Sequence, residues 1–432
     1  MCIDAVAKSR NRDSHLIAEQ ILERMIERCK RDNSTSVKPN SFTFSTVINA
    51  CANNSSIDCA APEKAERLLI RMIELGEELQ LGKPDAPLFN SVINCWAKSR
   101  VDHSAEKAEA LLLRMQHWHK SGITDVRPDT VTYTTVINAW CNKGGVEATE
   151  RAQKLLELMY LQYKADGEKH SCRPDSISFT AVIDGWARCG KGREAQLMLD
   201  RMVTLSLEPS RTTYALCLNA WSRSSAYDPD AAHQSEKLLR QMQVGGKVQP
   251  DSRCYNMVIH AYANSRGVSM KAKKAWEILN KMKQQYTNGD LDCKPDVFSY
   301  TSVINACARS PPNVSDPEMI INIAEQAMRE LRESSLFAQG PNSITYTALL
   351  KTYAKHLPFD SLLLKEKNIR KEFEQCCIDG YVNDYVLDTI RAIKSDVLLK
   401  QLIPSGNIPS HWSRNVKELR GRHKSEDLSF SR

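Results

Sequence analysis

The chain has 432 residues, a hydrophobic fraction of 42% and a formal net charge of +7 from 59 basic and 52 acidic residues. No apolar run is long enough to span a bilayer, which argues against a membrane partner, and the mild basic excess permits a polyanionic partner without demonstrating one. The fourteen cysteines form no Cys-x-x-Cys pair, so we expect no metal site and reduced thiols in a reducing compartment.

The first forty residues resemble the end of a unit that recurs later in the chain. Residues 3–10 align with residues 93–100, and residues 18–25 follow the second-helix pattern described below. We therefore expect a partial repeat over residues 1–40 that lacks its first turn, because the sequence is a fragment or its start codon is misassigned. An Arg-rich targeting segment would then lie upstream.

From residue 41 onward, a nine-residue phrase returns every 35 to 46 residues, in full as Thr132-Tyr-Thr-Thr-Val-Ile-Asn-Ala-Trp140. Its aromatic, its aliphatic pair and its final aromatic have the spacing of one apolar helix face. The Ser or Thr before the aromatic is predicted to be the helix N-cap. Near-copies begin at Thr43, Leu88, Ser178, Thr213, Cys254, Ser299 and Thr345. Self-similarity at this period indicates a stacked array in which no unit buries its apolar face alone.

A second pattern, Ala-x-x-Leu-Leu-x-x-Met, follows each phrase, as in Ala65 to Met72 and Ala108 to Met115. It has the same helical spacing, so each unit should consist of two helices. A Pro-Asp or a related pair then ends the unit, because proline stops the helix and turns the chain. This gives eight repeats, over residues 41–85, 86–129, 130–175, 176–210, 211–251, 252–296, 297–342 and 343–384.

These three features together resemble the pentatricopeptide repeat rather than the tetratricopeptide repeat with its Trp-x-x-Leu-Gly pattern. The resemblance covers residues 41–384, and only the fourth repeat has the usual length of 35 residues. It implies an all-α fold, a right-handed superhelical solenoid of tandem helix-turn-helix repeats. Residues 385–402 are predicted to form a C-terminal capping helix, and residues 403–432 a basic, disordered tail.

Pentatricopeptide repeats bind single-stranded RNA with one base per repeat, so the resemblance implies the same here. The polar residue after the aromatic and the last residue of the repeat would together contact the Watson–Crick edge of one nucleotide. The first set, which we name the reading column, is Ser45, Asn90, Thr134, Thr180, Ala215, Asn256, Thr301 and Thr347. The second set, the end column, is Asp85, Asp129, Asp175, Ser210, Asp251, Asp296, Asn342 and Asp384. Helix capping is the competing explanation for the end column.

Two further columns fit the same resemblance. The second residue of each repeat would sandwich bases between neighbouring repeats; this stacking column includes Phe42, Val131, Ile177, Phe298 and Ile344, with inter-repeat packing as the alternative. A cation two residues after the final aromatic would follow the phosphate backbone, with a solvated helix face as the alternative. This cation column is Lys98, Arg188, Arg223, Arg309 and Lys355.

The pairing rules of the family give a target site. Uridine is implied by Asn90 with Asp129 and by Asn256 with Asp296. Guanosine is implied by Ser45 with Asp85, Thr134 with Asp175, and Thr347 with Asp384. Thr301 with Asn342 implies adenosine, Thr180 with Ser210 is ambiguous, and Ala215 departs from the pattern because its side chain forms no hydrogen bond. The expected site, 5′ to 3′, is G-U-G-N-N-U-A-G.

Catalysis is not expected. The sequence has neither the His-x-Glu and Pro-Cys-x-x-Cys motifs of a zinc deaminase nor a phosphate-binding glycine loop, and it indicates no cofactor and no small-molecule substrate. We expect a role in RNA processing, stability or translation in the mitochondrion or plastid, with an RNA-processing enzyme or the ribosome as a further partner. The alternative is an α-solenoid scaffold that binds proteins in the same groove.

Overall fold

The computed structural model describes residues 2–8, 13–32, 39–78, 84–167, 172–244, 248–266, 268–312, 316–333, 340–357, 362–393 and 409–416. Every regular element in these ranges is a helix, which confirms the predicted all-α solenoid fold. None of the described helices is long and apolar enough to cross a membrane. The chain divides into an N-terminal half, Met1–Pro209, and a C-terminal half, Ser210–Arg432, and each half is described by itself.

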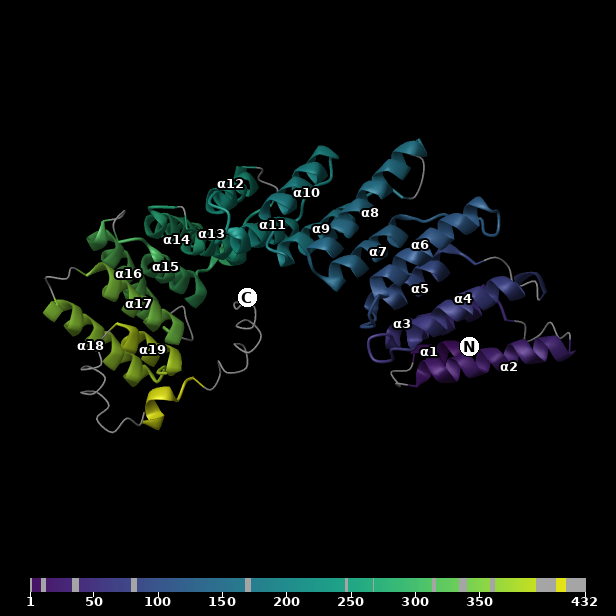
Figure 1. Ribbon diagram of the computed structural model, residues 1–432, viewed down its shortest axis with the longest axis horizontal. Helices are drawn as coiled ribbons and strands as arrows, with labels where there is room; N and C mark the ends of the chain where they lie inside the picture. The colour runs from purple at the N-terminus through teal and green to yellow at the C-terminus, as the bar shows by residue number, and fades with distance from the viewer. Residues whose placement is uncertain are drawn as a thin grey trace. The chain divides into compact units, whose positions relative to one another are not determined.

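The described part of the N-terminal half consists of antiparallel helix pairs (Figure 1). In each complete pair the first helix carries the repeated phrase and the second carries the Ala-x-x-Leu-Leu-x-x-Met pattern, whereas the first helix of the N-terminal pair carries only the end of the phrase. The pairs are α1 (Cys2–Lys8) with α2 (Ser14–Asp32), α3 (Ser41–Asn54) with α4 (Ala61–Glu78), α5 (Ala86–Lys98) with α6 (Ser104–Lys120), α7 (Thr130–Lys143) with α8 (Val146–Ala165), and α9 (Ser176–Arg188) with α10 (Gly192–Thr204).

The C-terminal half continues the same pattern. Its pairs are α11 (Arg211–Ser224) with α12 (Ala231–Val244), α13 (Ser252–Asn264) with α14 (Lys271–Thr287), α15 (Val297–Arg309) with α16 (Pro317–Glu333), and α17 (Ser343–His356) with α18 (Leu362–Asp379). A short 3₁₀ helix, η2 (Leu291–Cys293), lies between α14 and α15. Helix α19 (Asp384–Ala392) and the 3₁₀ helix η4 (Ser410–Ser413) follow α18.

Within each half, the first helices of successive repeats pack against one another, and each second helix also contacts the first helix of the next repeat. The aromatic of the phrase is buried in this core, as at Phe44, Tyr133 and Tyr255. Burying such a side chain stabilises the fold by about 1.5–3 kcal/mol. A row of equivalent first helices therefore runs along each half, with equivalent residues at equivalent places.

Polar bridges on the second helices fix the spacing of the repeats. The indole of Trp140 donates to Glu109 of the preceding repeat at 2.9 Å, and Arg151 of the following second helix pairs with the same carboxylate. Trp96 and Arg114 bind Glu66 in the same way, at 3.2 and 2.9 Å. Each of these acids links its own repeat to the next one, so the distance between first helices is set by these polar bridges as well as by the apolar core.

The N-caps of the first helices differ from the prediction. The Ser or Thr before the aromatic is the third residue of the helix, and the N-cap is the last residue of the preceding repeat, as for Asp129 with Thr132 and Asp175 with Ser178. In each case the carboxylate accepts from the backbone N–H of the third residue, whose hydroxyl accepts from the N-cap N–H, a capping box. The Ser and Thr hydroxyls that were predicted to be N-caps therefore take part in the capping box, but they lie three residues after the N-cap itself.

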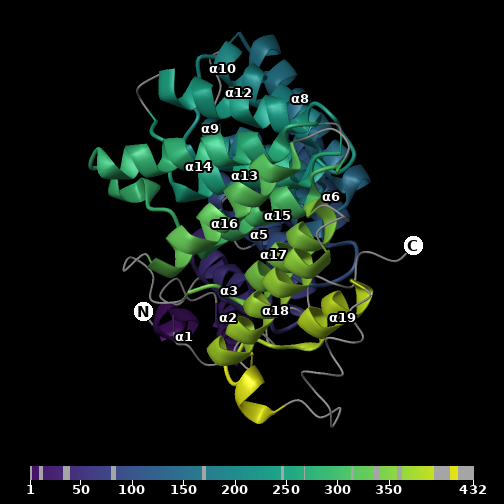
Figure 2. The same cartoon turned by 90° about the vertical axis from the view of Figure 1, so that its left-hand side faces the viewer.

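The C-terminal end also differs from the prediction. Helix α19 spans Asp384–Ala392, in the region predicted as a capping helix, and residues 394–402 of that prediction lie outside the described residues. Within residues 409–416, which were expected in a disordered tail, Ser410–Ser413 form η4. The Trp412 carbonyl accepts from Val382 N–H at 2.8 Å, and the Trp412 indole lies edge-on to Phe373. Figure 2 shows α17, α18 and α19 packed together in this region. This ring contact and the hydrogen bond to Val382 join the segment to the end of the repeat array. Residues 403–408 and 417–432 lie outside the described residues.

Gly380 makes this docking possible. Its φ of +76° is unfavourable for any residue with a side chain, and a Cβ at this position would come within 2.5 Å of Arg414 Cγ. The arginine crosses this glycine to donate to the carbonyl of Ile378. The segment 409–416 is thereby held against the end of α18.

Candidate nucleic-acid interface

The structure brings two predicted reading pairs into direct contact. Asn90 Nδ2 lies 3.3 Å from Asp129 Oδ1, and Asn90 Oδ1 accepts a hydrogen bond of 2.7 Å from Thr132. The sixth repeat reproduces the arrangement, with Asn256 Nδ2 lying 3.2 Å from Asp296 Oδ1 and Ser299 donating to Asn256 Oδ1 at 2.7 Å. In both repeats, therefore, the reading residue contacts the end residue of the same repeat, which lies at the boundary with the next repeat.

The threonines of the reading column hydrogen-bond differently. Thr301 shares a hydrogen bond of 2.7 Å with Thr345 of the next repeat, whereas Thr180 and Thr347 donate to backbone carbonyls one turn earlier in their own helices. The hydroxyl of Thr134 is buried and has no partner among the described residues. Ser45 and Ala215 are half-buried.

Seven of the eight end-column residues cap helices, as the competing explanation proposed. Asp85, Asp129, Asp175, Ser210, Asp251, Asp296 and Asn342 are each the N-cap of a first helix. The fourth pair is divided between the halves, since Thr180 belongs to one and Ser210 to the other. Capping uses one carboxylate oxygen in several of these residues, so capping and base contact are compatible.

The predicted end residue of the eighth repeat is wrong by one position. Asn383 is the N-cap of α19, and its side chain accepts from Val386 N–H at 3.0 Å. Asp384 is the first residue of the helix itself. The sequence contains Asn and Asp side by side, and only the cap geometry distinguishes them. By the register of the other repeats, Asn383 rather than Asp384 is therefore equivalent to the end residues.

The stacking column is largely exposed to solvent. Four of its apolar side chains are about half exposed or more, Phe42 at 67%, Val131 at 57%, Ile177 at 65% and Phe298 at 49%. Ile344 is half-buried. Inter-repeat packing was the alternative for this column, and it does not account for side chains that face water. An apolar surface thus recurs at the same place in successive repeats.

The cation column is exposed at all five positions. Arg188 pairs with Asp184, Arg309 donates to Asn264, and Lys355 lies 3.5 Å from the carbonyl of Ala308. Lys98 and Arg223 have no hydrogen-bond or ion-pair partner among the described residues.

A buried cation extends the positive region of the C-terminal half. Lys271 donates to the carbonyl of Ser265 at 2.9 Å. Burial, together with the nearby charges of Lys355 and Arg309, lowers the pKa of Lys271 to about 8. These three cations are therefore close enough to influence one another, and an anion beside them would relieve their repulsion.

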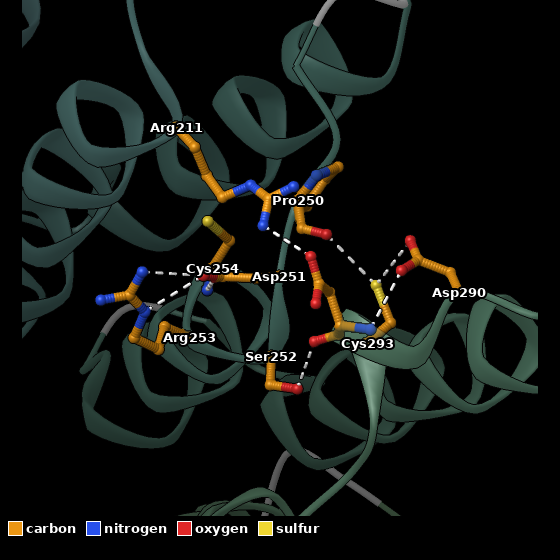
Figure 3. A network of polar contacts seen from close by, with 9 residues as sticks. Arg211, Pro250, Asp251, Ser252, Arg253, Cys254, Asp290 and Cys293 are labelled. Carbon is orange, nitrogen blue, oxygen red and sulfur yellow. Dashed lines mark hydrogen bonds and ion pairs between the residues drawn. The ribbon is translucent and has the colours of Figure 1, made fainter.

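The boundary between the fifth and sixth repeats holds a polar network that the sequence did not reveal (Figure 3). Asp251 is 8% exposed, and its carboxylate accepts from Cys254 N–H at 3.0 Å and from Arg253 at 2.9 Å. Burial alone would raise the pKa of Asp251, but these hydrogen bonds and the Arg253 charge lower it below its usual range. Arg211 binds Asp292 of η2 at 2.7 Å.

This network changes what the fifth repeat can do. Arg253 stands in the stacking column, where most other repeats carry apolar residues, and it occupies the carboxylate of Asp251. The reading partner in the same repeat is Ala215, which forms no side-chain hydrogen bond. The fifth repeat therefore lacks both a free end residue and a polar reading residue.

His260 is a further residue that the sequence did not single out. Its ring lies 2.8 Å from Ser222 Oγ, near Asn264, and its centroid is 5.9 Å from that of Phe298. Burial and the charge of Arg309 lower the pKa of His260 to about 4, so the ring is neutral at pH 7. The signal available in the sequence was that His260 stands where most of the other repeats carry an asparagine.

The described residues include no cluster of His, Cys, Asp or Glu that could hold a metal ion. The described cysteines are unpaired and mostly buried, and burial raises the pKa of thiols such as Cys95 and Cys141 to about 12. Such thiols are packing residues rather than nucleophiles.

Comparisons with known proteins agree with the repeat pattern. A family model described as "PPR repeat family" matches residues 250–309, and models described as "PPR repeat" match residues 124–160 and 177–207, where PPR stands for pentatricopeptide repeat. These matches fall in both halves of the chain. No curated protein sequence matches the chain.

Solved structures with some similarity include two of the pentatricopeptide repeat protein PPR10. The crystal structure of PPR10 from maize has 17% identity over 93% of this chain, with a TM-score of 0.44. PPR10 in complex with an 18-nt psaJ RNA element has 19% identity over 85% of this chain, with a TM-score of 0.39. This chain spans 59% and 51% of those two chains, respectively.

Proposed function

This chain is a pentatricopeptide repeat protein, and from that premise we propose that it binds single-stranded RNA in a sequence-dependent way, one nucleotide per repeat. The observation that carries the proposal is the exposed stacking column beside the reading pairs. Apolar side chains such as Val131 and Ile177 face water at the same place in successive repeats. A base placed between two such side chains would remove them from water, and the reading pair would meet its edge.

The reading pairs support sequence preference in this surface. Asn90 and Asn256 each present an amide next to a carboxylate, so the two side chains offer a donor and acceptors at fixed positions. The threonine repeats offer a hydroxyl in place of the amide. Different pairs therefore present different hydrogen-bonding patterns to a base.

The structure alters the proposed target at one place and leaves another open. Asn383, not Asp384, is the N-cap equivalent to the other end residues, so the rule that assigns adenosine to Thr301 with Asn342 would assign adenosine to the eighth base as well. The fifth base remains unspecified, because Ala215 has no polar group and Arg253 occupies the end residue. We propose G-U-G-N-N-U-A-A, read 5′ to 3′.

Selection from a random pool of single-stranded RNA, at a stated salt concentration, tests this proposal. Enrichment of the motif is the expected result, and the variant Asn256→Thr is expected to shift the sixth base from uridine toward guanosine. An unchanged preference in that variant would show that the assigned register is wrong. If no RNA is retained in competition with heparin, the protein-binding scaffold becomes the better explanation.

By family resemblance, we place this activity in the mitochondrion or plastid. Occupancy of one RNA site would protect an end from exonucleases, prevent competing structure, or recruit a processing enzyme or the ribosome. All three roles follow from binding alone and require no catalytic residue. Localisation of the tagged full-length product of the gene is the measurement that tests the organelle.

A further inference from the structure

A row of asparagines lies on the first helices, four residues after the reading column. Its members, which we name the asparagine row, are Asn49, Asn94, Asn138, Asn219 and Asn305. Asp184, His260 and Lys351 occupy the same place in the other three repeats. Residues four apart lie on one face of a helix, so this row runs between the reading column and the cation column.

Two larger residues show where side chains of this row point. The ring of His260 stacks on Phe298, with centroids 5.9 Å apart. Lys351 Nζ lies 4.6 Å from the ring centroid of Tyr385 and 3.0 Å from its hydroxyl. Phe298 and Tyr385 are each the second residue after an N-cap position, Asp296 and Asn383. A side chain in this row therefore reaches toward the stacking position of the next repeat.

The asparagines are available for a ligand. None of the five is fully buried, and none has a hydrogen-bond partner among the described residues. Their counterparts are occupied, since His260 bonds Ser222 and Asp184 pairs with Arg188. The amides of the reading residues Asn90 and Asn256 are likewise engaged within the protein. Amides without a partner among the described residues thus recur at this one place in five of the eight repeats.

We propose that the asparagine row binds the ribose 2′-hydroxyl groups of the RNA and gives the protein its preference for RNA over DNA. This inference rests on the proposed function and adds the group that recognises the sugar. A base held beside the stacking column places its ribose between the base and the phosphate, and the row lies between the reading column and the cation column. The asparagines are therefore the side chains placed to contact the ribose.

The chemistry of the side chain favours the hydroxyl over the phosphate. An amide both donates and accepts, as a ribose hydroxyl does, whereas a phosphate oxygen only accepts. Cations serve a phosphate better, and the cation column is one helical turn away. The 2′-hydroxyl is also the group by which a protein distinguishes RNA from DNA at a given site.

The test compares binding of RNA and DNA by the full chain. The probes are an RNA oligonucleotide carrying the selected motif and the DNA oligonucleotide of the same base sequence, with deoxyuridine in place of uridine. The variant combines Asn94→Ala, Asn138→Ala and Asn305→Ala, and the matched control is Asn288→Ala, at the exposed C-terminal end of α14. Alanine favours helix, so folding should be retained, and circular dichroism checks this.

We expect the wild-type protein to prefer RNA, and the triple variant to bind RNA roughly threefold to tenfold more weakly for each asparagine replaced while its DNA affinity stays the same. The control should behave as wild type. An equal weakening on RNA and DNA would mean that the row contacts phosphate or base, and would overturn the inference, as would unchanged binding of both. A wild-type protein that binds both nucleic acids equally also overturns it, whereas one that binds neither refutes the proposed function itself.

Discussion

A single side chain in the end column has two separable properties, a cap and a hydrogen-bonding edge. Asp175 accepts from Ser178 N–H at 2.8 Å, which stabilises α9, and it retains a second carboxylate oxygen. Asparagine can cap in the same way but replaces that oxygen with a donor. The two roles that the sequence left as alternatives are therefore compatible in one residue.

The variants Asp175→Asn and Asp175→Ala separate these roles. The asparagine variant should keep the free energy of unfolding within about 0.5 kcal/mol of wild type and shift the third base from guanosine toward adenosine. The alanine variant should be destabilised by about 1 kcal/mol because the N–H of Ser178 no longer has its acceptor. Urea denaturation followed by circular dichroism gives the stability, and RNA selection gives the base. If the asparagine variant leaves the base preference unchanged, Asp175 is a cap alone.

The eighth repeat tests the register at the same scale. Asn383→Asp should move the eighth base from adenosine toward guanosine, since Asn383 is the N-cap that faces the next repeat boundary. Asp384→Asn, one residue further on, should leave the preference as it is. Binding to two oligonucleotides that differ only in the last base measures both variants. The opposite result, with Asp384 controlling the base, would restore the assignment made from the sequence.

At the scale of the element, the first helices are held at fixed spacing by residues away from the exposed columns. In the N-terminal half, Glu109 accepts from Trp140 and pairs with Arg151, so one acid joins α6 to α7 and α8. In the C-terminal half, helix α13 carries Asn256, His260 and Asn264 on one face, toward its neighbours α11 and α15. The position of each column thus depends on polar groups between the helices.

Because His260 is one of these polar groups between the helices, the free energy of unfolding should depend on pH. Burial and the charge of Arg309 lower its pKa from 6.5 to about 4 in the folded protein. The unfolded chain therefore binds the proton more readily between these values, and the free energy of unfolding should decrease as the pH falls from about 6.5 toward about 4.

The variant His260→Gln should reduce that pH dependence, whereas the exposed control His117→Gln should not. Part of the dependence of the free energy of unfolding on pH should remain in His260→Gln, since burial also lowers the pKa of His356. Urea denaturation at pH 7 and at pH 5 measures the difference. Equal slopes in wild type and His260→Gln would show that this imidazole is equally hydrated in both states.

At the scale of the whole molecule, charge is nearly balanced, since 59 basic residues oppose 52 acidic ones. Affinity for RNA would therefore depend on where the cations lie rather than on their number. Several are engaged, as Arg188 is with Asp184 and Arg151 with Glu109. Within the cation column, Lys98 and Arg223 have no partners among the described residues, so these two are the members that we expect to neutralise phosphate.

The double variant Lys98→Ala and Arg223→Ala should weaken RNA binding about equally for all sequences. The slope of log K against log salt should become less steep by roughly 0.7 for each phosphate that is no longer neutralised. Lys154→Ala, an exposed lysine on the second helix α8, is the control for net charge. Titrations of RNA at several salt concentrations give the slopes. A slope equal to that of wild type would show that these two side chains do not contact phosphate.

The sequence by itself determined the repeat and its two helices. Apolar residues spaced as in Tyr133, Val136 and Ile137 can only be buried by stacking equivalent helices, and the periodicity needs no tertiary information. The reading and stacking columns, in contrast, came from the resemblance to the pentatricopeptide repeat and not from the spacing alone.

Only the tertiary structure decided which residue caps each helix, which side chains are occupied, and where the tail folds. Asn383 and Asp384 are both good N-cap residues, and the backbone geometry selects the first of them. The pairing of Arg253 with Asp251 and the docking of Trp412 on Phe373 depend on contacts that helical periodicity does not encode. The free asparagine row is likewise defined by the partners that the surrounding helices do not provide, which is a property of packing in three dimensions.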